Sequence, residues 1–298
     1  MKKNSVIYII SIFIILSCTK ELPIKEVENN SLSINSLITP DSIVEININS
    51  ISSMNETPVF VDDAKISFYQ NDSFLTELAY NNNGWYKSFF YPQTDKNYKI
   101  KIEHNNKTYT AKTYIPSKTI IKNATIKFTD NYNENQEPIS TIKISFYDNK
   151  ETNNYYELIF FHNLNEYGRE LLDYFNFYNM NEAVVLNEGD WQFQPTSIFF
   201  SDELFNGDTL NMKFDVLIMP YCENNNLYAE LRSISKSYYL YRKYWTRHYF
   251  NQQNDEHVDD PLMILFQGEP IEMYSNIDTG YGIFAGYSSD IKKIECLN

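Results

Sequence analysis

The feature that most constrains the fold of this chain is an alternation of apolar and polar residues with a period of two. It recurs between Leu32 and Pro116 in short segments that turn-forming residues separate. The clearest segments are Val44–Ile48, Ala64–Phe68 and Tyr98–Ile102. Successive side chains of a β-strand point to opposite faces, so each segment is predicted to be a half-buried strand. The turns between them are Thr39-Pro40-Asp41, Asn81-Asn82-Asn83-Gly84 and Asn105-Asn106. Such turns join antiparallel strands, so residues 31–117 are predicted to form an Ig-like or transthyretin-like antiparallel β-sandwich.

The following residues, 118–298, are predicted to form a second β-rich domain with one long amphipathic helix. Its strand segments place apolar residues on single faces: Ala124, Ile126 and Phe128; Ile142, Ile144 and Phe146; Met212, Phe214, Val216 and Ile218. The helix is predicted over about 226–250, where apolar residues recur at spacings of four and three: Leu227, Leu231, Ile234, Tyr238, Tyr241 and Trp245. Cap candidates are Asn224-Asn225-Asn226. Such a helix must cover an apolar surface, either the domain's own sheet or a partner.

The amino-terminal segment has the pattern of a bacterial lipoprotein signal. Lys2 and Lys3 precede the apolar run Val6–Leu16, and Ser17 precedes Cys18. This run is shorter than the roughly 20 residues of a membrane-spanning helix, so we expect residues 1–17 to be a removed signal peptide. Cys18 would then carry the lipid, and the polar residues 18–30 would form a tether.

The charge of the chain argues against two kinds of partner. Its formal net charge is −14 at pH 7. Such a surface repels phosphate backbones and anionic headgroups, so we expect no nucleic-acid binding and no membrane attachment by a basic patch. Contact with the lipid bilayer is expected through acylated Cys18.

The two remaining cysteines leave two interpretations open. Cys222 and Cys296 can form a disulfide, as an even pair does in an exported protein, or they can be buried free thiols. The chain has no CxxC pair, so the sequence does not support a thiol-redox site or a cysteine-rich zinc site.

The sequence gives little support for catalysis or for metal binding. The chain has no G-x-S-x-G, H-E-x-x-H, phosphate-binding or dinucleotide-binding motif. His257 lies in an acidic stretch that fits a surface loop or, less simply, a metal site. Asp148, Glu151 and Asn154 fit a hairpin turn or a calcium site. We therefore predict no catalytic residue, no metal and no cofactor.

Aromatic residues are unusually abundant, with 25 Tyr, 20 Phe and 3 Trp. They fill the cores of β domains, but exposed tyrosines and tryptophans also bind sugars and proteins. The run Tyr238–Trp245 holds more aromatic residues than one helix face can bury. We therefore expect Tyr239 and Tyr244 to lie near solvent or another chain, and Tyr239, Arg242, Tyr244 and Trp245 to be candidate partner-binding residues.

Several ordered motifs resemble a known family, the Bacteroidota outer-membrane lipoproteins called domain of unknown function 4249. The motifs are Leu32–Asp41, Val61–Ala64, Tyr114-Ile115-Pro116, Phe146-Tyr147-Asp148, Asn154-Tyr155-Tyr156, Ser201–Gly207, Tyr274–Ile277 and Gly280–Phe284. The resemblance implies a two-part β-rich lipoprotein of the outer membrane, often encoded beside a TonB-dependent receptor, without an established activity or catalytic residues. This chain departs from the family at Thr279, where a second glycine is common, so the geometry of that turn is in question.

Three functions follow as hypotheses. The first is a non-enzymatic, lipid-anchored outer-membrane protein accessory to a TonB-dependent transporter, which captures cargo or stabilises the receptor. The second is a surface glycan-binding or adhesive module, because its β scaffold can expose aromatic residues. The third is a hydrolase, which would need convergent carboxylates or a catalytic triad.

Overall fold

A computed structural model describes residues 31–51, 57, 59–132, 136, 138–163, 169–171, 175–176, 197–217, 226–252 and 271–297. These residues belong to one compact unit, Ser31–Asn298. The predictions for the signal peptide, Cys18 and the tether fall on residues outside these ranges and stay predictions. In the described part of the chain, no helix is both long and apolar enough to cross a membrane.

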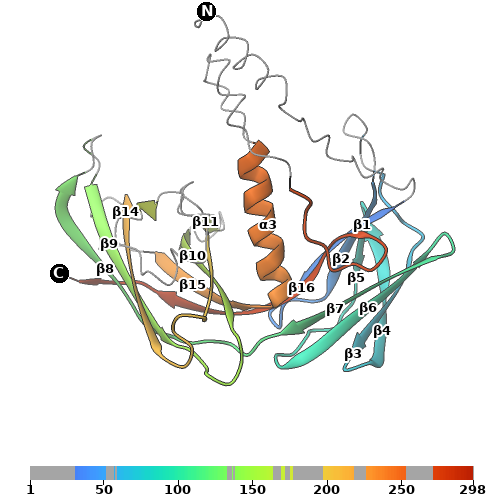
Figure 1. The fold of residues 1–298 in the computed structure, drawn as a ribbon, viewed down its shortest axis with the longest axis horizontal. Coiled ribbons are helices and arrows are strands. Elements are labelled where there is room, and N and C mark those ends of the chain that lie inside the picture. Colours follow the sequence, from blue (N-terminus) through green and yellow to red (C-terminus); the bar gives the residue numbers. More distant parts are fainter. Residues whose placement is uncertain are drawn as a thin grey trace, which may run out of the picture. The chain divides into compact units, whose positions relative to one another are not determined.

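The protein is mainly β, as predicted, with one helix in the described ranges (Figure 1). The strands of its amino-terminal half are β1 Leu32–Ile38, β2 Glu45–Ser50, β3 Lys65–Gln70, β4 Ser73–Asn82, β5 Trp85–Lys87, β6 Lys96–His104 and β7 Lys107–Ile115. The remaining elements are β8 Ile121–Tyr132, β9 Pro138–Tyr147, β10 Tyr155–Asn163, β11 Arg169–Leu171, β12 Phe175–Asn176, β13 Ser197–Ser201, β14 Thr209–Leu217, β15 Leu227–Ile234, α3 Lys236–Gln252, β16 Tyr281–Lys293 and β17 Glu295–Leu297.

The strands form two sheets. The larger runs in the order β11-β10-β15-β16-β1-β2-β5-β4-β3-β6-β7, with β13 also paired to β10, and the smaller runs β12-β14-β9-β8-β17. Two of the predicted turns are confirmed, because Asn83 and Gly84, and likewise Asn105 and Asn106, have positive φ angles. Two consecutive residues with positive φ form the tight turn that matches the twist of a hairpin.

Two large apolar clusters fill the protein. The amino-terminal cluster gathers aliphatic and aromatic side chains from β1 to β7, together with Ile277 and Phe284 from the end of the chain. The carboxy-terminal cluster lies among residues 121–294 and includes Phe146, Phe160 and Phe200. The last part of the chain therefore contributes to the core of the first part.

Strand β16 connects the two halves. It pairs in parallel with β1, placing Ile34 opposite Gly282, and antiparallel with β15. Gly282 has a φ of +103°, and a Cβ atom there would lie 2.1 Å from the carbonyl oxygen of Ile34. Only glycine fits this position without moving the backbone.

Thr279, three residues earlier, has a φ of +62°, so it adopts the left-handed conformation that glycine favours. Its hydroxyl donates a hydrogen bond to the carbonyl oxygen of Thr108, at 3.1 Å.

The prediction of a helix over 226–250 is wrong in its first third. Residues 227–234 form β15, and α3 begins at Lys236. Leu227 and Leu231 are four residues apart, a spacing that puts side chains on one face of a helix and also on one face of a strand. The actual cap is Ser235, whose hydroxyl accepts a hydrogen bond from the backbone N–H of Tyr238, at 3.3 Å. Asn226 is described and precedes β15, whereas Asn224 and Asn225 lie outside the described residues.

Cys296 lies in β17, packs against the carboxy-terminal cluster and is disulfide-bonded. Cys222 lies outside the described residues, so the predicted pairing of these two cysteines stays a prediction.

Candidate functional site

Helix α3 lies over the larger sheet of its own chain, against β10, β13 and β16. A third apolar group, the helix cluster, fills this contact with Phe199, Ile234, Tyr238, Tyr239, Ile283 and Ala285. The inward side of α3 is therefore occupied by its own sheet, and only its outer side can meet another molecule.

The four candidate partner-binding residues have different surroundings. The expectation that Tyr239 faces solvent is wrong, because its side chain is only 6% exposed. Its ring centroid lies 4.8 Å from that of Tyr155, a contact between α3 and β10. Tyr238 was expected to be buried and Tyr239 to be exposed, but both side chains are buried. Both belong to the helix cluster between α3 and the sheet.

Arg242 is half-buried and held within the chain. Its guanidinium lies 4.4 Å from the ring centroid of Phe199 and 5.0 Å from that of Trp245. One of its amino groups donates to the Ser197 hydroxyl, at 3.4 Å. The guanidinium of Arg242 therefore contacts both Phe199 on β13 and Trp245 on α3.

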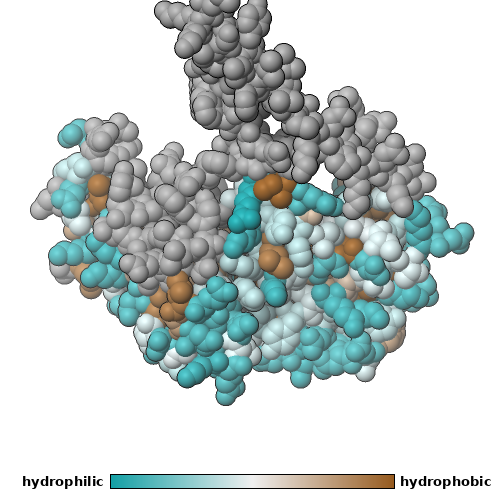
Figure 2. All heavy atoms as spheres, in the orientation of Figure 1, coloured by the Kyte–Doolittle hydropathy of each residue, from teal (hydrophilic) through white to brown (hydrophobic). Residues whose placement is uncertain are grey.

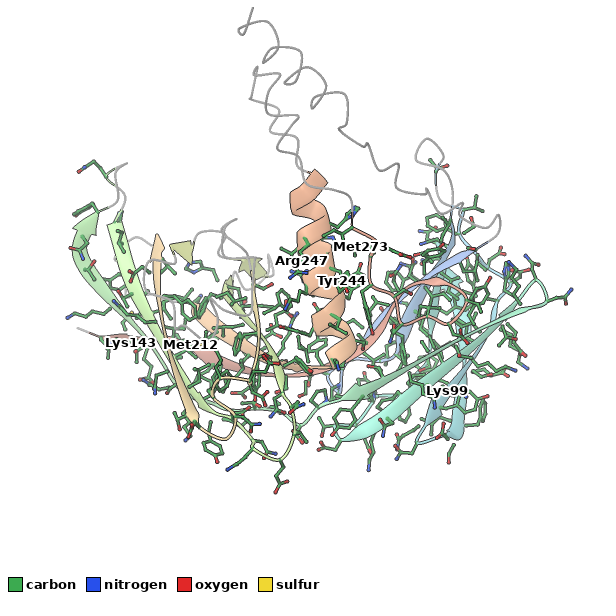
Figure 3. The ribbon with its side chains drawn as sticks, viewed as in Figure 1. Lys99, Lys143, Met212, Tyr244, Arg247 and Met273 are labelled. Carbon is green, nitrogen blue, oxygen red and sulfur yellow. The ribbon has the colours of Figure 1, made fainter. Side chains whose placement is uncertain are left out.

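The outer side of α3 exposes aromatic and basic side chains. Tyr244 and Trp245 are 37% and 38% exposed, and Arg247 is exposed. Figure 3 labels Tyr244 and Arg247 on α3, and Met273 on the segment that runs beside the helix. The contacts with this segment include Tyr244 with Tyr274, whose ring centroids are 6.1 Å apart, and a 2.9 Å hydrogen bond between His248 Nδ1 and the Ile271 carbonyl oxygen. We call Tyr244, Trp245 and Arg247 the α3 face.

The charge of α3 contrasts with that of the whole chain. Its sequence, KSYYLYRKYWTRHYFNQ, has two lysines, two arginines and no acidic residue, whereas the chain carries a net charge of −14. On the side of the molecule that Figure 2 draws, hydrophobic residues are scattered among hydrophilic ones. Helix α3 is thus a basic, aromatic element in an acidic protein.

Below α3, two buried glutamates share one arginine. Glu157 on β10 and Glu230 on β15 are each 3% exposed. Arg232 donates to Glu157 at 3.0 Å and to Glu230 at 2.8 Å, and its guanidinium lies 4.8 Å from the ring centroid of Tyr287. Burial disfavours the charged guanidinium, but the negative charges of Glu157 and Glu230 outweigh it and raise the pKa of Arg232. We call these three residues the arginine cluster.

On the opposite side of β10, two buried aspartates share an asparagine. The Asn154 backbone N–H donates to Asp202 at 2.8 Å, and its side-chain amide donates to Asp148 at 3.1 Å. Asp148 also accepts a 2.5 Å hydrogen bond from the Tyr156 hydroxyl and a 2.8 Å bond from the Gly207 N–H. Burial, and then the charge of Asp148, raise the pKa of Asp202. We call Asp148, Asn154 and Asp202 the aspartate cluster.

These contacts favour the turn interpretation of Asp148, Glu151 and Asn154. The amide of Asn154 acts as a hydrogen-bond donor to Asp148, and Glu151 is exposed. In the described ranges, no group of three His, Cys, Asp or Glu side chains could hold a metal ion. His257 lies outside these ranges.

A cavity of about 880 Å³ lies where three segments meet. Its walls come from residues 114–122 between β7 and β8, residues 147–155 between β9 and β10, and residues 233–236 between β15 and α3, with Asp95 at one side. Ser117 donates to Asp95 at 2.6 Å and Tyr114 at 2.7 Å, and these bonds lower the pKa of Asp95. Burial, and then Asp95, raise the pKa of Tyr114 to about 12. We call this space the linker cavity.

The arginine cluster and the linker cavity were not among the features predicted from the sequence. A signal for the first exists, because Glu157 interrupts the otherwise apolar run Tyr155–Phe161, and a single charge in a buried strand needs a partner. The cavity has no comparable signal, since its walls are far apart in the chain.

Comparison with solved structures gives several matches. A putative membrane anchored protein from Corynebacterium diphtheriae is 11% identical, with a TM-score of 0.22, and the match covers 70% of this chain and 55% of that one. The chain thus spans about half the length of this protein, and the likeness is too low to support an argument. No curated protein matches.

The motifs that resembled a family lie in structured parts of the fold. Asn154 and Asp148 join two of them in the aspartate cluster, and Gly282 places another beside β1. The family model for a domain of unknown function, DUF4249, matches residues 19–293. This match spans nearly the whole chain, and the protein therefore belongs to the DUF4249 family.

Proposed function

We propose that this protein is a non-enzymatic, lipid-anchored outer-membrane protein that assists a TonB-dependent transporter, by capturing its cargo or by stabilising the receptor. Acyl chains on Cys18 would hold it at the membrane. Confinement to a surface raises the effective concentration of a protein near its partner, so a small contact area suffices.

The observation that carries the proposal is the α3 face. Tyr, Trp and Arg are the residue types that contribute most to protein interfaces, and here Tyr244, Trp245 and Arg247 are exposed together on a rigid helix. The stacking of Arg242 on Trp245 orders this face before binding, which lowers the entropy cost of association. Because α3 is basic, the complementary surface on the transporter is acidic.

The test is co-purification of the lipidated protein with its receptor from detergent-solubilised membranes, followed by mass spectrometry. The wild type is expected to bring down a TonB-dependent receptor. The double variant Tyr244→Ala/Arg247→Glu is expected to lose at least nine-tenths of that recovery.

A matched control is Lys143→Glu, which reverses an exposed charge on β9, away from α3. It should retain the receptor, and all three proteins should have the same melting temperature. Equal recovery by the α3 variant and the control, or purification of the wild type alone with the receptor intact in the membrane, contradicts the proposal.

We also propose that residues 31–117 form an Ig-like or transthyretin-like sandwich and that α3 is amphipathic. Hairpin-linked antiparallel strands around one apolar cluster support the first proposal. The buried Tyr238 and exposed Arg247 support the second.

A further inference from the structure

We propose that the linker cavity binds an acidic oligosaccharide, a sugar chain that carries carboxylate or sulfate groups. This site is separate from the α3 face. Its volume of about 880 Å³ lies within the range of about 300–1,000 Å³ that is usual for small-molecule sites.

The charge of the cavity selects for an anion. Lys118, Lys122 and Lys236 line it, and within the described part of the chain none of the three forms an ion pair. Asp95 also lines the cavity, and the hydroxyls of Ser117 and Tyr114 donate to it without cancelling its negative charge. Exposed Glu151 lines the cavity as well, so three lysines face the two carboxylates of Asp95 and Glu151. An excess of one positive charge is notable in a chain of net charge −14, and it gives an anionic ligand a locally favourable potential.

The start of α3 adds to this potential. Ser235 and Lys236 lie in the cavity wall, and the first turn of the helix contains no acidic residue. The amino-terminal end of a helix carries a partial positive charge, which stabilises a nearby anion by about 0.3–1 kcal/mol at an exposed site. The helix end supports the lysines and does not define the site by itself.

The rest of the wall is typical of sugar recognition. Tyr147 and Tyr114 line the cavity and are 50% and 39% exposed. Lys122 lies 5.1 Å from the ring centroid of Tyr147, so a cation and an aromatic surface are presented together. The wall also includes the polar residues Thr119, Asn149, Thr152 and Asn153. Aromatic rings pack on the apolar faces of sugar rings, while polar groups meet their hydroxyls.

The test is calorimetric titration of the full lipidated protein in detergent with four probes. These are an oligogalacturonate, a heparin-derived oligosaccharide, neutral maltohexaose and a poly-glutamate peptide. At least one of the two acidic oligosaccharides is expected to bind at least tenfold more tightly than both maltohexaose and poly-glutamate. Equal affinity for maltohexaose, tighter binding of poly-glutamate or no binding of either acidic sugar overturns the proposal.

Variants then locate the site. Lys118→Ala/Lys122→Ala/Lys236→Ala is expected to weaken binding of the acidic sugar at least tenfold, and Tyr147→Ala at least threefold. The matched control Lys127→Ala/Lys143→Ala/Lys213→Ala removes three exposed lysines of the smaller sheet and should bind as the wild type does. Because the removed lysines and Tyr147 are exposed, all variants should keep the wild-type melting temperature. Wild-type affinity in the cavity variants, or an equal loss in the control, overturns the proposal.

Discussion

The two sides of strand β10 bury carboxylates in different ways. Tyr156 donates a hydrogen bond to Asp148 of the aspartate cluster, whereas the next residue, Glu157, pairs with Arg232 in the arginine cluster. The two glutamates both pair with Arg232, whose single positive charge offsets one of their two negative charges. The two aspartates are held by amide and hydroxyl donors, and within the described residues neither forms an ion pair. A buried carboxylate can thus be stabilised by one opposite charge or by several neutral donors, and the two solutions should fail differently.

The largest effect is expected from Arg232→Met. This change leaves Glu157 and Glu230 buried without their cation, which typically costs about 3–5 kcal/mol. Urea denaturation followed by circular dichroism would measure the loss in the free energy of unfolding.

The triple variant Arg232→Met/Glu157→Gln/Glu230→Gln separates charge from packing. It removes all three charges together, so it should recover at least half of the stability that the single variant loses. A single variant that loses less than about 1 kcal/mol would show that the arginine cluster does not depend on charge neutralisation.

An intermediate effect is expected from Asp148→Asn. The amide has one oxygen for three donors, so the N–H of Gly207 or the hydroxyl of Tyr156 loses its acceptor. An unsatisfied buried donor costs about 1–3 kcal/mol, again measured by urea denaturation.

Tyr156→Phe is the matched control, because it removes one donor and leaves the carboxylate in place. Its cost should be smaller, about 1 kcal/mol. If Asp148→Asn is as stable as the wild type, the donors around Asp148 do not discriminate between a carboxylate and an amide.

The smallest effect is expected from Asp202→Asn. Burial and the charge of Asp148 raise the pKa of Asp202 above its ordinary value of 3.8. A carboxyl whose pKa is higher in the folded protein than in the unfolded chain lowers stability at neutral pH, and this loss disappears as the pH falls through the folded pKa towards 3.8. Replacing Asp202 with neutral asparagine should therefore change stability by less than about 1 kcal/mol at pH 7, where a lost hydrogen bond offsets the removed charge.

The pH dependence provides the sharper measurement. Relative to the variant, the wild type should gain stability as the pH is lowered through this window. A wild type that instead loses stability relative to Asp202→Asn would show that the hydrogen bonds from Asn154 outweigh burial.

The sequence predicted elements whose pattern is local, and the structure differs where the pattern depends on distant partners. Asn83-Gly84 and Asn105-Asn106 predicted hairpins because their backbone preference is set by the residues themselves. Leu227 and Leu231 were misassigned to a helix because a spacing of four fits both periods, and β10 and β16 decide in favour of the strand.

In the candidate site, too, the predictions fail where distant residues determine the outcome. Tyr244 was predicted to lie near solvent and is exposed, whereas Tyr239 is buried by Tyr155, which lies 84 positions earlier in the printed sequence. Trp245 was placed on the apolar stripe of the helix, yet its side chain is exposed. The linker cavity depends on three segments whose meeting no local pattern records.

The parallel pairing of β1 with β16 has a consequence for how the chain folds. Ser33 is paired with Tyr281, and Phe284 belongs to the amino-terminal cluster, so this cluster stays open at one edge until Phe284 has been synthesised. Contacts between residues so distant in the chain form slowly, and unpaired edges invite aggregation meanwhile. Premature termination before Gly282 would thus leave the early half of the protein dependent on chaperones.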